Sequence, residues 1–144
     1  MKENSVKLYV IRHGETDWNC RRRLQGEADI PLNGNGQRLA EITREHMGRI
    51  PFDLVITSPY QRARKTAQII TGAAHIPCIQ DARIREITWG DWDGLTPEEI
   101  ANAGGKERFE QFYTDPFSFQ GAPGGENIRQ VCERGKAFYE ELIR

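Results

Sequence analysis

A short run of chemically capable residues, Arg12-His13-Gly14-Glu15-Thr16, follows an apolar segment near the start of the chain. A neutral imidazole is a good nucleophile near neutral pH, because its reference pKa is about 6.5. Arginine presents a planar and permanently charged fork to phosphate oxygens, and glycine lets the backbone approach them without a Cβ. The run therefore indicates attack by His13 on phosphorus. The alternative is a histidine that only packs or hydrogen-bonds at the end of a strand.

Several hydrogen-bond donors must surround a phosphoryl group in transfer, because its charge is spread over three equatorial oxygens. The candidate donors are Arg12, Asn19, Arg62 and the backbone amides of the loop after the first strand. This chemistry needs no metal, and His, Cys and Asp do not occur together at metal-ligand spacing. We therefore expect neither a metal nor a cofactor.

Alternating strands and helices must position these groups. Apolar or β-rich runs predict strands over 7–11, 52–57 and 77–80. Cap residues and apolar periodicity predict helices over 34–47, 60–71, 97–104 and 128–144, the first after the N-cap Asn33 and the third after the capping box at Thr96. The segment 117–125 is rich in glycine and proline, which predicts a loop. This alternation predicts an α/β fold with a parallel sheet.

Composition narrows the classes of partner. The chain has 144 residues, 38% hydrophobic and 28% charged, with a net charge of −1, so no overall field draws it to nucleic acid or to an acidic membrane. No run approaches the roughly 18 apolar residues of a membrane span. Cys20, Cys78 and Cys132 are far apart, which is typical of reduced thiols that pack inside a cytoplasmic protein. We expect a cytoplasmic protein with no nucleic-acid and no membrane partner, and leave a homodimer open.

Five sequence blocks follow one another along the chain: RHGETDWN (12–19), LQGEADIPLNGNG (24–36), SPYQRARKTA (58–67), REITWGDWDGLT (85–96) and PGGEN (123–127). In this order they resemble the histidine phosphatase superfamily, which contains the cofactor-dependent phosphoglycerate mutases and their phosphatase relatives. The resemblance implies a three-layer α/β fold in which helices flank a mostly parallel central sheet. It also implies hydrolysis of a phosphate ester in two steps through phosphohistidine.

The resemblance also implies a role for each matched residue. His13 would be the nucleophile, and Glu86 would be the general acid that later activates water, a task that suits a carboxylate. The phosphate-binding residues would be Arg12, Thr16, Asn19, Gln25, Gly26 and Arg62. The alternative for Glu86 is a surface glutamate paired with Arg83 or Arg85.

One element of the family pattern has no match. A second histidine belongs to a later His-Gly element, but His46 and His75 come too early and neither precedes glycine, so the role is transferred to neither. The last predicted helix reaches Arg144 without a stop signal. We therefore expect residues 1–144 to form a single incomplete domain without the family's C-terminal strands, and to be weak or inactive alone.

The compact segment 87–100 after Glu86 is similar to the phosphatase branch, because the mutases carry a longer insertion there. We therefore expect a phosphatase acting on a small phosphorylated metabolite. A cofactor-dependent phosphoglycerate mutase and a non-catalytic phosphoester-binding module stay open as alternatives. Trp89 and Trp92 are predicted to pack the loop that presents Glu86. A loop over 105–125 is predicted to offer a pocket wall, with the side chains of Lys106, Arg108, Phe109, Phe112 and Tyr113.

Overall fold

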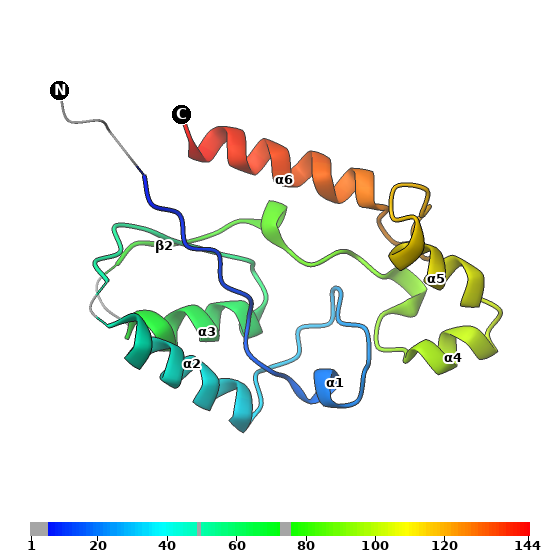
Figure 1. Ribbon diagram of the computed structural model, residues 1–144, viewed down its shortest axis with the longest axis horizontal. Coiled ribbons are helices and arrows are strands. Elements are labelled where there is room, and N and C mark those ends of the chain that lie inside the picture. Colours follow the sequence, from blue (N-terminus) through cyan, green and yellow to red (C-terminus); the bar gives the residue numbers. More distant parts are fainter. Residues whose placement is uncertain (1–5, 49, 73–75) are drawn as a thin grey trace.

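The computed structural model describes residues 6–48, 50–72 and 76–144 (Figure 1). The helices are α1 (Asp17–Cys20), α2 (Gly34–Met47), α3 (Gln61–Thr71), α4 (Pro97–Asn102), α5 (Lys106–Thr114) and α6 (Ile128–Leu142). The strands are β1 (Val55–Thr57) and β2 (Cys78–Gln80), and the 3-10 turns are η1 (Ala82–Ile84) and η2 (Gly90–Trp92). In Figure 1, α2 and α3 lie side by side below the sheet, α4 and α5 lie at the opposite end, and α6 runs along the top.

The sheet is parallel, as predicted. β1 and β2 pair in a register that runs from Val55 opposite Cys78 to Thr57 opposite Gln80, and α3 forms the crossover between them. Both strands are shorter than the predicted 52–57 and 77–80. Because α3 packs against both β1 and α2, this unit places the start of α3 beside the carboxyl end of β1.

The predicted strand over 7–11 is wrong: residues 6–15 have no strand assignment. This segment runs as an open trace in Figure 1, and its apolar side chains are exposed, with Val6 at 82% and Val10 at 87%. A strand exists only through hydrogen bonds to a neighbour, and the strands of the described residues pair with each other alone. The sequence supplies β propensity here, but the pairing partner is not among the described residues.

The predicted helix starts are confirmed. Asn33 accepts a hydrogen bond from the Gly36 amide at 2.8 Å and so caps α2. Thr96 and Glu99 form the capping box of α4. The last helix ends at Leu142 rather than at the predicted last residue.

The core of the chain's second half is an aromatic cluster. Its buried members are Ile87, Trp89, Trp92, Ile100, Phe119 and Ala122. The prediction that both tryptophans pack the loop after Glu86 is therefore confirmed. The predicted loop over 105–125 is wrong in its first half, because 106–114 form α5. Phe109 and Phe112 turn from this helix onto Trp89, at ring-centroid distances of 6.3 and 5.0 Å, so they build the core rather than a pocket wall.

The cysteine prediction also needs correction. Cys20, Cys78 and Cys132 are free thiols as predicted, but all three are exposed and none packs inside. No helix in the described ranges is both long enough and apolar enough to cross a membrane.

Candidate active site

The ring of His13 is oriented by its own loop. Its Nδ1 lies 2.7 Å from the carbonyl oxygen of Gly14. A carbonyl can only accept, so Nδ1 carries the hydrogen and Nε2 keeps its lone pair. Burial lowers the pKa of His13 below its ordinary value, and the charges of Arg62 and Arg12 lower this pKa further, against the opposing Gly14 bond and the charge of Glu86. The ring is therefore a neutral imidazole at neutral pH.

The backbone at Gly14, next to His13, lies between helices α2 and α3. The Gly14 amide donates to the Thr66 hydroxyl on α3 at 3.0 Å, and that hydroxyl donates to the Arg62 carbonyl. A Cβ on Gly14 would lie 2.6 Å from the Gly36 carbonyl oxygen in the first turn of α2. Only glycine permits this approach, so the loop sits close against α2.

Three of the predicted phosphate-binding residues bond to one another. Thr16 is fully buried, and its hydroxyl donates to the Gln25 side-chain oxygen at 2.6 Å. The Thr16 amide donates to the side chain of Asn19 at 2.9 Å, which completes the capping box of α1. These contacts join the loop after His13 to the next predicted block of the site.

Arg62, at the start of α3, holds the loop 25–28 by its carbonyls. Its side chain is 1% exposed and donates to Ala28 at 2.8 Å, to Gly26 at 3.0 Å and to Gln25 at 3.4 Å. The guanidinium also lies 4.6 Å from the centre of the Tyr60 ring. Burial lowers the pKa of Arg62, and the charge of Glu86 is the largest influence that opposes this shift.

Asp93 holds the same loop from its amides. Its two carboxylate oxygens accept from the Gly26 amide at 2.6 Å and the Ala28 amide at 2.8 Å. Asp93 is not among the residues predicted from the sequence. The only signal for it is an acidic side chain inside the block 85–96, which also contains Glu86.

The loop 25–28 in turn lies against the chain that follows Glu86. A Cβ on Gly26 would lie 2.9 Å from the Trp89 nitrogen and 3.0 Å from the Ile87 oxygen. These are backbone atoms that cannot swing aside. This contact joins the loop that Arg62 holds to the segment that carries Glu86.

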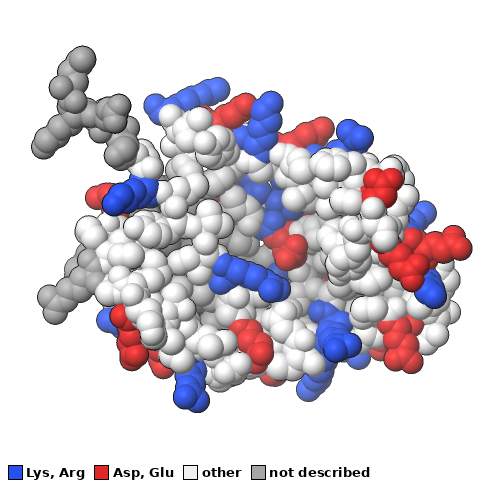
Figure 2. Space-filling view, in the orientation of Figure 1, with Lys and Arg blue, Asp and Glu red and all other residues white. Residues whose placement is uncertain are grey.

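Glu86 is exposed, and its Oε1 accepts from the Ile87 amide at 2.9 Å. The alternative of an ion pair with a neighbouring arginine is wrong. Arg83 pairs with Asp81 at 2.6 Å and with Glu141 at 2.7 Å, and Arg85 pairs with Glu126 at 3.0 Å. Figure 2 shows charged atoms of both signs around a hollow near the middle of the face in view.

Arg12 and the two histidines that were not assigned a role lie apart from these contacts or outside the described residues. Arg12 is exposed and forms no hydrogen bond within the described ranges, although its charge reaches His13. His46 is exposed on α2, where its ring bonds the Ile42 carbonyl. His75 lies outside the described residues. No group of three or more His, Cys, Asp or Glu side chains in the described part of the chain could hold a metal ion.

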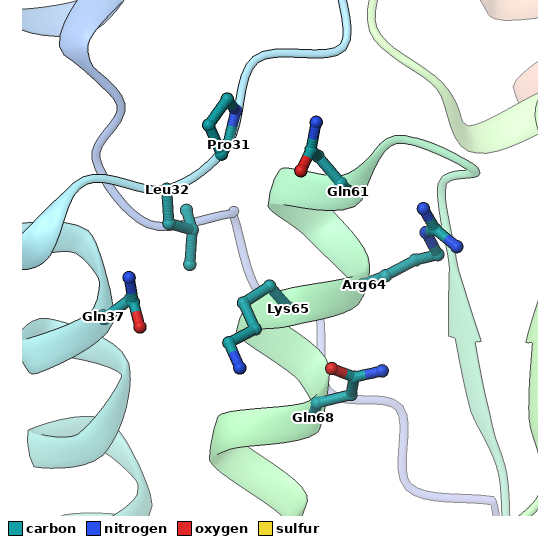
Figure 3. A pocket seen from close by; sticks show the side chains of 7 residues that line it. All are labelled: Pro31, Leu32, Gln37, Gln61, Arg64, Lys65 and Gln68. Atoms are coloured by element: carbon teal, nitrogen blue, oxygen red, sulfur yellow. The ribbon is translucent and has the colours of Figure 1, made fainter.

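A cavity of about 340 Å³ lies between α2 and α3, on a different face of α3 from Arg62. Its lining residues are Pro31, Leu32, Gln37, Gln61, Arg64, Lys65 and Gln68. In Figure 3, Lys65 reaches from α3 toward α2. None of the predicted site residues lines this cavity.

Residues 8–144 match the sequence profile of the histidine phosphatase superfamily (branch 1). The chain belongs to this superfamily. The resemblance carried by the five sequence blocks is thereby confirmed.

Relatives of this histidine phosphatase chain include proteins named as phosphatases and as mutases. The uncharacterized phosphatase PhoE of Bacillus subtilis is 42% identical over 90 residues, which are 62% of this chain and 47% of PhoE. The protein named probable phosphoglycerate mutase GpmB of Serratia proteamaculans is 34% identical over 96% of this chain and 63% of its own length. Bacillus stearothermophilus YhfR shares the fold with a TM-score of 0.84 and 36% identity, over 92% of this chain and 64% of YhfR. The chain thus spans less than two thirds of each of these relatives.

Proposed function

We propose that this histidine phosphatase chain carries the site of a phosphomonoesterase, which hydrolyses a small phosphorylated metabolite through a phosphohistidine intermediate. The observation that carries the proposal is the hydrogen bond from His13 Nδ1 to the Gly14 carbonyl. It leaves the Nε2 lone pair available as a nucleophile, in a ring whose pKa is lowered by burial.

In the first step, His13 Nε2 attacks phosphorus. A P–N bond forms, the P–O bond to the leaving group breaks, and Glu86 donates its proton to the leaving oxygen. In the second step a water loses a proton to the Glu86 carboxylate and attacks phosphorus. The P–N bond breaks and inorganic phosphate leaves, which restores both residues.

The phosphoryl oxygens would be held by Arg12 and Arg62. The three carbonyl contacts of Arg62 do not use all five donors of a guanidinium, so donors remain for phosphate. Gly26 brings its backbone close to the segment after Glu86, while Thr16, Asn19 and Gln25 keep the two loops together.

A hydrolase rather than a mutase is supported by the segment after Glu86. It passes through η2 into α4 without an insertion and packs into the aromatic core, so it adds no wall that would retain a bisphosphate. We further propose that turnover by these 144 residues is slow, because the family's second histidine has no match among them. Loss of one such donor commonly costs about a hundredfold or more in rate.

The test is the first turnover with p-nitrophenyl phosphate at high protein concentration. We expect a burst of p-nitrophenolate and one acid-labile phosphate on His13, both lost in His13→Ala. His46→Ala is the matched control and should keep both, because His46 is exposed on α2. Hydrolysis that survives His13→Ala would refute His13 as the nucleophile. Phosphate binding without transfer by either protein would support a non-catalytic module instead.

A further inference from the structure

The backbone of the segment that carries Glu86 accepts hydrogen bonds from a side chain of the last helix, α6. Arg134, on α6, donates to the carbonyl oxygens of Arg83 at 2.7 Å, Arg85 at 2.8 Å and Glu86 at 3.1 Å. Its side chain is only 13% exposed. One guanidinium therefore fixes the backbone at Glu86 and immediately before it.

Glu126 holds the other side of the same segment. It accepts from the Thr88 amide at 2.9 Å, from Arg85 at 3.0 Å and from Arg134 at 2.9 and 3.0 Å. Burial alone raises the pKa of Glu126, but the bonds from Arg134 and Thr88 outweigh it, so this pKa lies below its ordinary value. The carboxylate is therefore ionised at neutral pH and acts as an acceptor only.

We infer that Glu126 and Arg134 form a positioning pair for Glu86. The pair fixes the backbone on both sides of Glu86, from the Arg83 carbonyl to the Thr88 amide, and so sets the place from which the exposed carboxylate acts on His13 and Arg62. Neither residue touches the reacting atoms. The catalytic meaning of this placement rests on the proposed function of Glu86.

Other ion pairs of α6 do not share this geometry. Arg83 bonds Glu141, whose side chain is 70% exposed, and that contact reaches only η1. Lys136 and Glu140 pair along the helix surface at 3.6 Å. These pairs could also help to attach α6 to the rest of the molecule. Among these ion-pairing residues of α6, Arg134 is the one that contacts the backbone of Glu86.

The test is a double-substitution cycle read out by the pKa of His13, measured by NMR titration of its ring. Because the Glu86 charge raises the pKa of His13, Glu86→Gln should lower that pKa in the wild-type background. In the Arg134→Gln background the same substitution should lower it by less than half as much. The cycle cancels the direct effect of the lost arginine charge. An undiminished effect of Glu86→Gln in the Arg134→Gln background would overturn the inference.

Matched variants separate positioning from folding. Lys136→Gln should leave the effect of Glu86→Gln on the pKa of His13 unchanged. Arg134→Lys should not restore the full effect, because an ammonium cannot reproduce the planar guanidinium that reaches three carbonyls. If Arg134→Gln does not fold, the same cycle with Glu126→Gln decides, with the same expected and opposing results. A Glu86→Gln variant that hydrolyses phenyl phosphate, whose more basic leaving oxygen needs protonation, at the wild-type rate would refute Glu86 as the acid while leaving the positioning result readable.

Discussion

The segment 6–11, which leads to His13, and the segment 87–100, which follows Glu86, are both rich in apolar residues but are packed very differently. Val10 is 87% exposed, whereas Ile100 is fully buried and Trp89 is 6% exposed. The second segment finds its partners nearby, in the aromatic residues of α5 and in Phe119. The first has β propensity but no pairing partner among the described residues. The comparison shows that apolar sequence leads to burial only where the rest of the structure supplies a neighbour.

The supports of the two proposed catalytic groups also differ. His13 is held by the carbonyl of the adjacent Gly14 and, through the Gly14 amide, by Thr66 on α3, which lies 52 positions further along the chain. Glu86 follows a backbone that is fixed on one side by Arg134 and is joined on the other to a buried core. Each group thus depends on a side chain that is distant in sequence, and the Glu86 side is also joined to the buried aromatic core.

The largest expected effect is in the aromatic core. Phe119→Ala removes a ring that is 1% exposed, so it should lower the free energy of unfolding by about 3–5 kcal/mol. Val10→Ala should change it by less than about 0.5 kcal/mol, because that side chain is already in solvent. Urea denaturation followed by tryptophan fluorescence measures both. Similar losses for the two variants would show that the segment 6–11 is packed after all.

A smaller effect is expected where the loop 25–28 meets the chain after Glu86. Gly26→Ala places a methyl group 2.9 Å from the Trp89 nitrogen, so it should destabilise the fold by about 1–3 kcal/mol. Gly34→Ala is the matched control: nothing lies within 4 Å of the added carbon, and the helical site should gain up to about 1 kcal/mol. Thermal unfolding followed by circular dichroism compares the two. A Gly26→Ala variant with unchanged thermal stability would mean that this contact can relax.

Local signals were enough to predict most of the elements. The cap at Asn33 and the capping box at Thr96 act within one helical turn, so the sequence contains everything that they need. The parallel pairing of β1 and β2 also followed from the strand–helix–strand order. The strand over 7–11 could not be judged in this way, because strand formation depends on a distant partner. The helix α5 was missed because its aromatic residues were assigned to a pocket wall instead of a core.

The residues of the site differ in the same way: some carry a local signal in the sequence, and others do not. His13, Arg62 and Glu86 were predicted from sequence blocks, and the charges of Arg62 and Glu86 both influence the pKa of His13. Asp93 and Arg134 were missed because each acts on backbone groups far away in the chain. Backbone hydrogen bonds leave no pattern in the sequence, so a carboxylate or guanidinium that serves them resembles an ordinary surface charge.

Asp93→Asn should moderately destabilise the loop 25–28, whose carbonyls bind Arg62. The amide keeps one oxygen acceptor but loses the second, so one of the two bonds to the amides of Gly26 and Ala28 is lost, at a cost of about 1–2 kcal/mol. Asp91→Asn is the control, because Asp91 is exposed and lies on the other side of Trp92 from Asp93. Hydrogen exchange at the Gly26 and Ala28 amides should accelerate in the first variant alone. Equal protection in both variants would assign the support of this loop to Arg62.

The smallest expected effect is on the titration of His13. Burial is the main cause that lowers its pKa, and the charge of the exposed Arg12 adds to it. Arg12→Gln should therefore raise the pKa of His13 by a fraction of a unit, and added salt should raise it in the wild type by screening the same charge.

Because the folded-state pKa of His13 lies below the unfolded value of about 6.5, the unfolded chain binds more protons in the pH window between the two values. The free energy of unfolding should thus rise with pH through that window, level off above it and fall as the pH decreases. His13→Gln should flatten this slope. A pKa of His13 that stays low in high salt would assign the shift to burial, and one that returns to about 6.5 would assign it to the arginines.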